Sequence, residues 1–188
     1  MTKVFVGGSR KLSRININVK AKIDAMIQKG YIILVGDANG ADKSFQRYLF
    51  EQRYGNVIVF CMANGCRNNL GRWEERRIKV NNNKNGFEYY AAKDVEMSKE
   101  ADYGFMLWDA KSKGTVQNII NLLKSNKRTL VYISSERNFI VLDTLDDIPN
   151  LLEKSDIKDR KLIEDKLKIS SMLKTRAMQS EFDIIVRS

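Results

Sequence analysis

The sequence predicts an α/β protein: a Rossmann-like three-layer sandwich with a mainly parallel sheet of five or six strands, followed by a C-terminal helical extension. Three observations support this. Short apolar runs alternate with segments of helical apolar spacing, which is typical of strands joined by helical crossovers. The runs are continuously apolar, which indicates strands buried on both faces of a parallel sheet. Several of them end in polar loops that contain glycine.

The first half of the chain predicts three strands and two helices. The strands are the apolar runs at residues 4–6, 31–35 and 56–60. Helical spacing covers residues 15–29, and Gly30 is expected to end that helix. A second helix is expected to open at Asn39–Asp42, with Phe45, Tyr48 and Leu49 on one face.

The second half is less regular at first. The charged segment Arg72–Arg77 is expected to be helical, and residues 81–86 form a polar loop. Regular alternation then resumes, with helical spacing at 87–101, a strand at 103–108, a helix from Gly114, a strand at 129–133 and a candidate edge strand at 138–142.

Pro149, the single proline, is taken as the domain boundary. Residues 1–148 are expected to form one nucleotide-binding domain, and residues 149–188 a helical extension with a candidate short strand at 182–186. The extension carries apolar residues in helical spacing, so it is a candidate oligomerisation element or lid, and packing on its own sheet is the alternative. A homo-oligomer is expected.

The composition is basic, with 33 Lys and Arg against 23 Asp and Glu and a net charge of +10. This favours an anionic partner, either a phosphorylated small molecule or a nucleic acid. No apolar run approaches the length of a membrane span, and the N-terminus enters a strand pattern without a signal peptide. A cytoplasmic protein with no membrane partner is therefore expected.

Metal and histidine chemistry are not expected. The chain contains no histidine, so any catalysis would depend on carboxylates, Lys, Tyr, Cys or backbone dipoles. Cys61 and Cys66 are too few for a disulfide framework, and a zinc site would need two further ligands, so a buried or incidental role is expected for both. No cofactor is expected.

Three loops follow predicted strands, and ligands of open parallel sheets bind at such carboxyl ends. Their candidate ligand-binding residues are Gly7, Gly8, Ser9 and Arg10 in the first, Gly36, Gly40 and Asp42 in the second, and Trp108, Asp109, Ser112, Lys113, Gly114 and Thr115 in the third. Backbone N–H groups, hydroxyls and cations in this pattern suit a phosphate.

Each candidate also has a simpler interpretation. The first loop is also compatible with a tight turn, and Asp42 and Asp109 can cap their loops or helices instead of contacting ribose hydroxyls. Trp108 or Tyr90 is expected to face a base, with core packing as the alternative for the tryptophan. Neither a Walker A loop nor an intact Gly-x-Gly-x-x-Gly occurs.

Taken together, these loops resemble the SLOG superfamily, which includes the YspA/YpsA-like proteins, the LOG phosphoribohydrolases and the DNA-processing protein DprA. The resemblance covers roughly residues 3–133 and implies a Rossmann-like fold that binds a nucleotide or nucleotide derivative at these loops. In the LOG pattern, a catalytic Arg and Glu fall at Lys93 and Asn118 of this chain. An amide cannot act as a general acid or base, so the LOG reaction is not expected.

Three functions follow. The first is binding of a nucleotide-derived ligand, of ADP-ribose or cyclic nucleotide type, by a sensor or sequestering protein. The second is an enzyme that cleaves or exchanges the N-glycosidic bond of a nucleotide, with Asp94 and Asp109 as catalytic carboxylates. The third is DprA-like nucleic-acid binding through the basic cluster beside Trp73, formed by Arg67, Arg72, Arg76, Arg77 and Lys79. Whether the protein is an enzyme stays open.

Overall fold

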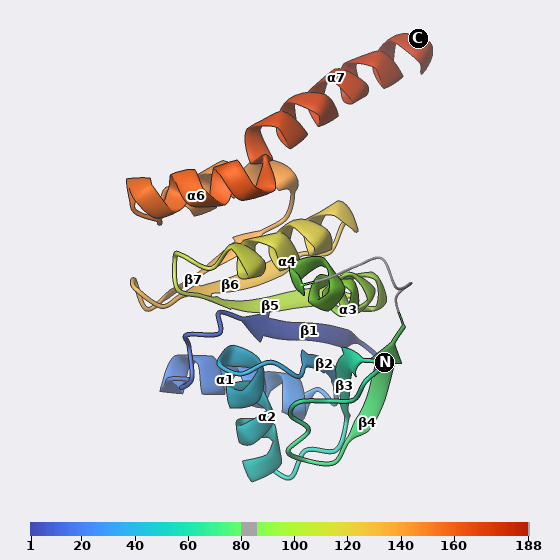
Figure 1. Ribbon diagram of the computed structural model, residues 1–188, viewed down its shortest axis with the longest axis vertical. Coiled ribbons are helices and arrows are strands. Elements are labelled where there is room, and N and C mark those ends of the chain that lie inside the picture. Colours follow the sequence, from blue (N-terminus) through green and yellow to red (C-terminus); the bar gives the residue numbers. More distant parts are fainter. Residues whose placement is uncertain (80–85, 188) are drawn as a thin grey trace.

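The computed structural model describes residues 1–79 and 86–187, without the side chains of 86–90 and 180–187. Its centre is a seven-stranded sheet of order β4-β3-β2-β1-β5-β6-β7 (Figure 1). The strands are β1 Lys3–Gly8, β2 Ile32–Gly36, β3 Val57–Met62, β4 Glu74–Ile78, β5 Tyr103–Trp108, β6 Thr129–Ile133 and β7 Asn138–Leu142. All pairings are parallel except that of β7 with β6.

Helices cover both faces of this sheet. One face is covered by α1 Ile17–Gln28 and α2 Ala41–Glu51, and the other by α3 Gly86–Glu100 and α4 Lys113–Lys124 (Figure 1). The predicted three-layer α/β sandwich with a mainly parallel sheet is therefore confirmed, and the candidate edge strand at 138–142 is the one antiparallel strand. The sheet has seven strands, not the predicted five or six, because residues 74–78 add a strand where a helix was expected.

Burial on both faces explains why the strands are continuously apolar. Successive side chains of a strand point to opposite faces. Val4 and Val6 of β1 pack with the α1–α2 layer, whereas Phe5 between them packs with the α3–α4 layer. All six residues of β3 are buried for the same reason.

The chain reverses its direction of travel across the sheet at β1. It runs outward from β1 through β2 and β3 to β4, and then returns to place β5 on the other side of β1. The loops that follow β1 and β5 therefore diverge to opposite faces. This is the topological switch point, where open α/β sheets form their ligand crevice.

Strand β4 corrects the sequence prediction, which expected a helix at Arg72–Arg77. Its charged side chains pair two residues apart along the same face of a strand: Arg76 with Glu74, and Arg77 with Glu75. A short, charged strand is also a suitable edge, because it discourages pairing with another sheet.

The C-terminal segment is wholly helical, so the candidate strand at 182–186 is also corrected. It comprises the 3₁₀ turn η1 Leu145–Asp147 and the helices α5 Ile148–Leu152, α6 Ile157–Leu167 and α7 Ile169–Arg187. Pro149 lies in the first turn of α5, where its missing N–H is not needed. Ile148, Leu151 and Ile163 join the same core cluster as α4.

Beyond Lys168, which adopts a left-handed conformation with φ of 52°, α7 points away from the sheet (Figure 1). Within the described part of the chain, no helix combines the length and the apolar character that crossing a bilayer requires.

We predict that Gly40→Ala destabilises the protein. Gly40 has a φ of +81°, and a β-carbon there would overlap the backbone of Arg10. Strained conformations of this kind cost about 1–3 kcal/mol each. Urea denaturation should show that loss in the free energy of unfolding. Gly55→Ala is the matched control, because a β-carbon at Gly55 would have no neighbouring atom within 4 Å. Equal stability of the two variants would contradict the prediction.

Candidate functional site

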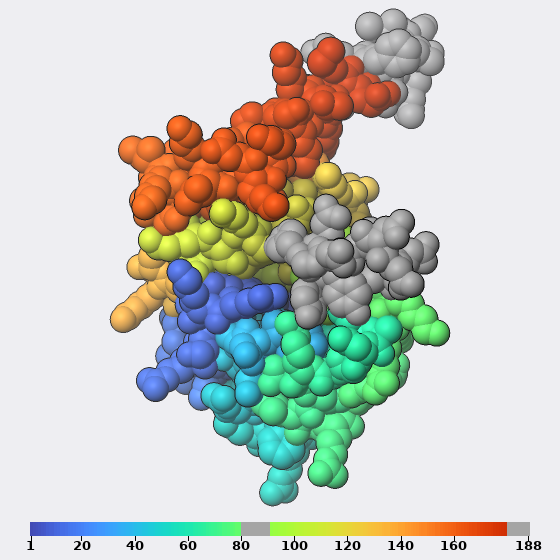
Figure 2. All heavy atoms as spheres, in the orientation of Figure 1, coloured from blue at the N-terminus to red at the C-terminus, as the bar shows by residue number. Residues whose placement is uncertain are grey.

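A cavity of about 550 Å³ opens at the carboxyl ends of β1 and β5, at the switch point. Figure 2 shows the segment after β1, in blue, between the yellow-green start of α4 and the cyan residues of α2. The residues that line the cavity are Phe5, Gly8, Ser9, Arg10, Lys11, Ala38, Asp42, Ala91, Asp94, Met97, Asp109, Lys111, Ser112, Gly114, Thr115, Gln117 and Asn118. We call this cavity the switch-point pocket.

Ser9 joins three loops beneath the pocket and is almost fully buried. Its N–H donates to the carbonyl of Leu107 in β5 at 2.9 Å, and its carbonyl accepts from the N–H of Ala41 in α2 at 3.1 Å. Its hydroxyl donates to Asp109 Oδ2 at 2.7 Å and accepts from the N–H of Lys11. The single hydroxyl proton is therefore used inside the protein, not offered to a ligand.

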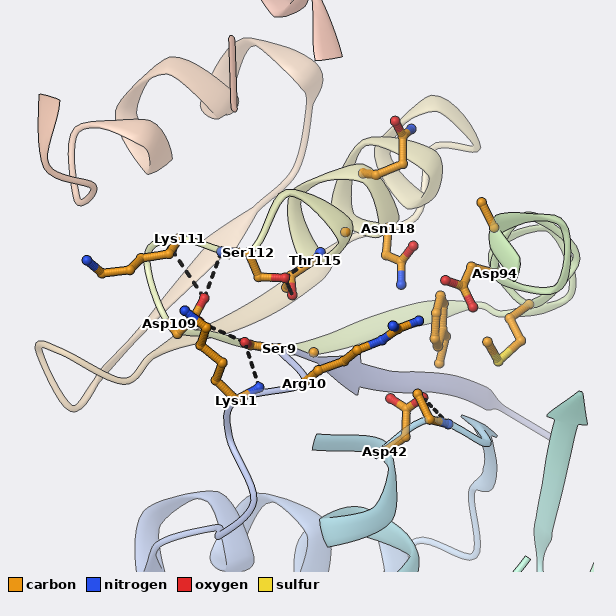
Figure 3. A pocket seen from close by; sticks show the side chains of 17 residues that line it. Ser9, Arg10, Lys11, Asp42, Asp94, Asp109, Lys111, Ser112, Thr115 and Asn118 are labelled. Carbon is orange, nitrogen blue, oxygen red and sulfur yellow. Dashed lines mark hydrogen bonds between the residues drawn. The ribbon is translucent and has the colours of Figure 1, made fainter. Parts of the chain in front are cut away.

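Asp109 closes the loop after β5. Besides the Ser9 hydroxyl, its carboxylate accepts the N–H of Ser112 at 2.8 Å and the N–H of Lys111 at 3.2 Å (Figure 3). Both carboxylate oxygens are thus engaged by the protein. This geometry matches the loop-capping alternative for Asp109 and leaves little of the carboxylate for acid–base chemistry or for ribose.

The first turn of α4 presents backbone donors to the pocket. Ser112 is the N-cap, and its hydroxyl accepts the N–H of Thr115. The preceding N–H groups, those of Lys113 and Gly114, have no intrahelical acceptor and no other protein acceptor in the described residues. Free N–H groups and the positive end of the helix dipole together favour an anion here.

Arg10 supplies the cation. Its side chain extends across the pocket, with the guanidinium on the side of Asn118 and Asp94 (Figure 3). It forms no ion pair with any residue that the structure describes. A guanidinium with free donors suits a phosphate, because its planar fork matches two phosphate oxygens.

The side of the pocket that the Arg10 guanidinium faces is also acidic, and a buried lysine lies behind it. Asp42 and Asp94 line the pocket, and Lys93 lies behind them with 3% of its surface exposed. The Lys93 Nζ lies 2.7 Å from Asp94 Oδ1 and 3.8 Å from Asp37 Oδ1. Asp37 in turn binds the Arg67 guanidinium at 2.6 Å.

Burial and charge set the protonation of this cluster. Burial raises the pKa of Asp42 to about 6, with a smaller opposing effect from Lys93. Burial also opposes the charged form of Lys93, but Asp94, Asp42 and Asp37 together outweigh it and raise the pKa of its ammonium. The pKa of Asp37 is lowered, since Arg67 and Lys93 outweigh the effect of burial. The cluster therefore holds Lys93 charged and leaves Asp42 able to take up a proton near neutral pH.

Gly36 permits this cluster to form. A β-carbon at this last residue of β2 would collide with the Asp42 carboxylate and with the Lys93 Nζ. Gly36 thus provides space for the buried charges and does not line the pocket.

The structure brings most of the predicted site residues together. Of those named from the sequence, Gly8, Ser9, Arg10, Asp42, Asp94, Asp109, Ser112, Gly114 and Thr115 line the pocket, whereas Gly7, Gly36, Gly40, Lys93, Trp108 and Lys113 do not. The side chain of Tyr90 lies outside the described residues. Sequence reasoning missed Lys11 and Gln117 as lining residues. Helical spacing of three from Gly114 would have indicated Gln117.

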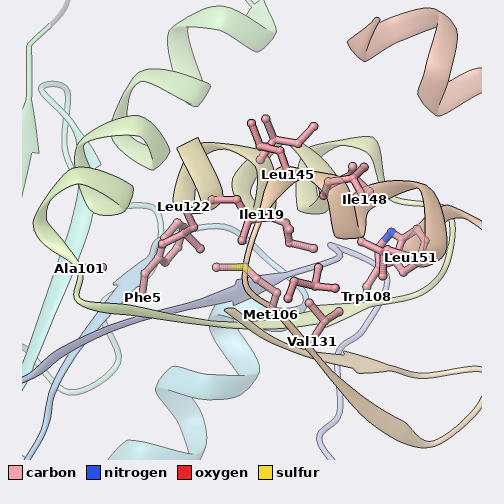
Figure 4. Packing of buried hydrophobic residues seen from close by; sticks show 14 of the residues in the cluster. Phe5, Ala101, Met106, Trp108, Ile119, Leu122, Val131, Leu145, Ile148 and Leu151 are labelled. Atoms are coloured by element: carbon pink, nitrogen blue, oxygen red, sulfur yellow. The ribbon is translucent and has the colours of Figure 1, made fainter. Parts of the chain in front are cut away.

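Trp108 does not face a base, and this corrects the expectation that it stacks on the ligand. Its side chain is fully buried and packs near Ile148 and Leu151 of α5 (Figure 4). The indole N–H donates to the carbonyl of Ser112 at 3.2 Å. Trp108 is thus a core residue that also supports the start of α4.

The basic cluster beside Trp73 is largely neutralised within the protein. Arg67 binds Asp37, Arg76 binds Glu74 and Glu100, and Arg77 binds Glu75. These ion pairs remove most of the positive potential that the sequence suggested for this surface, so it is a poor candidate for a nucleic-acid interface.

Cys61 and Cys66 form a disulfide, which corrects the expectation of a buried or incidental role for both, although Cys61 is buried. The bridge joins the end of β3 to the loop that carries Arg67. Through that loop it supports the ion pair of Arg67 with Asp37. Both sulfurs lie near a Glu75 carboxylate oxygen, but disulfide sulfurs are not thiolate ligands for a metal.

Comparisons with known proteins identify the fold. No family model and no curated protein matches the chain. A solved structure of DNA processing protein A from Helicobacter pylori, described for its single-stranded DNA binding mode, is similar with a TM-score of 0.50. The match covers 89% of this chain and 80% of that chain at 17% identity. At this identity the likeness is one of fold: the chain shares the Rossmann-like α/β architecture of DNA processing protein A.

We predict that Lys93→Met destabilises the protein in a pH-dependent way. Removing one partner of a buried charge cluster costs about 3–5 kcal/mol, because Asp37, Asp42 and Asp94 lose their shared cation. The loss should be largest at pH 8 and smaller at pH 5. A carboxyl whose pKa is raised on folding binds protons more tightly in the native state, so stability rises as pH falls through that pKa.

Urea denaturation of the wild type and the variant at both pH values measures this effect. Lys99→Met is the control, because Lys99 is an exposed cation of the same helix, paired with Glu96. A Lys93→Met loss as small as that of the control, or one independent of pH, would count against a buried charge cluster.

Proposed function

We propose that this protein binds single-stranded DNA and takes one phosphate of the strand into the switch-point pocket. The observation that carries the proposal is that one cavity is lined both by the Arg10 guanidinium, which has no ion pair among the described residues, and by Gly114, whose N–H group has no protein acceptor there. Together they provide a cation, a helix N-terminus and a backbone donor, which are the usual elements of a phosphate site.

Two further observations favour a nucleic acid as the carrier of that phosphate. The fold is shared with DNA processing protein A, whose solved structure concerns its binding of single-stranded DNA. In addition, the first acidic residue of the chain is Asp24, and it follows six cations: Lys3, Arg10, Lys11, Arg14, Lys20 and Lys22. Among the described residues, Lys3 is ion-paired with Glu100 and the other five cations are in no ion pair. Such a segment attracts a phosphate backbone.

A second candidate is a free nucleotide or nucleotide-derived ligand such as ADP-ribose. Asp42 and Asp94 favour it, since carboxylates that line the pocket can accept hydrogen bonds from ribose hydroxyls or base amino groups. The raised pKa of Asp42 also suits proton transfer, so cleavage of the N-glycosidic bond belongs to this candidate. In that chemistry the pair would be Asp42 and Asp94, because Asp109 is engaged by its own loop.

We predict that Arg10→Ala weakens binding of a fluorescent dT8 oligonucleotide by about 10-fold or more, as expected when a charged hydrogen bond to phosphate is lost. The slope of log affinity against log salt should also fall by about 0.7, which corresponds to one phosphate contact on a single strand. Fluorescence anisotropy across a range of salt concentrations measures both quantities.

Arg77→Ala is the matched control. Because Arg77 is already paired with Glu75, this variant should bind dT8 with the same affinity as the wild type. Competition with dTMP and ADP-ribose in the same assay separates the two candidates. Displacement of dT8 by either compound at a lower concentration than unlabelled dT8 would favour the free nucleotide. Absence of dT8 binding even at low salt would refute the proposal.

A further inference from the structure

A second groove lies next to the switch-point pocket, over α1 and α2. It has a volume of about 210 Å³ and is lined by Ser13, Arg14, Ile15, Lys20, Ser44, Arg47, Tyr48 and Glu51. We call it the α1–α2 groove. The function proposed above counts Arg14 and Lys20 in a basic segment but places no phosphate in this groove.

The two cavities are adjacent along two separate segments of the chain. Lys11 lines the pocket and Ser13 lines the groove, so the loop after β1 passes from one to the other within two residues. Asp42 and Ser44 repeat this relation in the first turn of α2. Two residues of extended chain span at most about 7 Å, so the walls of the two cavities approach each other along the loop after β1.

The groove is positively charged. Arg14, Lys20 and Arg47 contribute three cations against the single carboxylate of Glu51. None of the three cations is in an ion pair with a residue in the described ranges 1–79 and 86–187. This contrasts with the cluster beside Trp73, where most of the arginines are neutralised.

Tyr48 gives the groove an ordered floor. Its hydroxyl donates to Asp24 Oδ1 at 2.7 Å. The Lys20 ammonium lies 5.0 Å from the centre of the Tyr48 ring, within cation–π range, and is thereby held over the groove. Burial and Asp24 raise the pKa of Tyr48 to about 12, so the phenol stays neutral and adds no negative charge.

We infer that the α1–α2 groove binds the phosphates that follow the one held in the switch-point pocket, so that the protein grips a stretch of single-stranded DNA at two places. This inference rests on the proposed function. A free nucleotide has no neighbouring phosphodiesters to place in the groove, so the groove makes affinity depend on the length of the strand.

The test compares fluorescent dT2 and dT8 on the wild type, on Arg10→Ala and on the double variant Arg14→Ala/Arg47→Ala. Arg14 and Arg47 are both exposed, so the double variant should fold, and its thermal melt checks this. We expect the double variant to bind dT2 as the wild type does but to bind dT8 about 10-fold more weakly. Its salt slope for dT8 should fall by about 1.4, the value for two phosphate contacts on a single strand.

Lys161→Ala/Lys174→Ala removes the same charge from the exposed surface of α6 and α7 and should leave both affinities unchanged. If the double variant binds dT8 like this control while Arg10→Ala loses binding, the groove is refuted and the pocket stands. Failure of wild-type protein to bind either oligonucleotide refutes the proposed function and the groove together. If the Arg14→Ala/Arg47→Ala variant lost as much affinity for a duplex of the same length as it loses for dT8, the assignment of the groove to single strands would be wrong.

Discussion

The hydrogen bonds of Ser9 are the constraint on which the rest of the site depends. Through its N–H, carbonyl and hydroxyl, this one buried residue joins the loop after β1 to β5, to the start of α2 and to Asp109. Because these segments lie on either side of the switch point, their hydrogen bonds fix the width of the pocket between them. Arg10 follows Ser9 directly, so the same hydrogen bonds determine where its guanidinium emerges.

The positions of the unpaired cations, more than the net charge, determine where the protein can bind an anion. Three of the four arginines of the cluster beside Trp73 form ion pairs, with Asp37, Glu74, Glu75 and Glu100. The cations that remain without ion pairs in the described structure include Arg10 in the pocket and Arg14, Lys20 and Arg47 in the adjoining groove. The buried Lys93 has a different role, since its charge offsets the mutual repulsion of the Asp37, Asp42 and Asp94 carboxylates around it.

Much of the fold could be predicted from sequence, because continuous apolar runs and helical spacing are local signals. The strand at residues 103–108 and the helix from Gly114 illustrate this. Strand β4 could not be predicted in this way. Its ion pairs join residues two apart in the sequence, Glu74 with Arg76 and Glu75 with Arg77, and this spacing brings side chains together only once the sheet holds the segment extended. The site shows the same division. Glycine loops marked the pocket, whereas the burial of Trp108 and the joining role of Ser9 depend on contacts with residues distant in sequence.

The most direct test of the central claim is a crystal structure of the protein soaked or grown with a dT oligonucleotide. We expect one phosphate in the switch-point pocket, within hydrogen-bond distance of the Arg10 guanidinium and of the N–H group of Gly114. DNA bound elsewhere on the surface, with the pocket containing only solvent, would contradict this expectation.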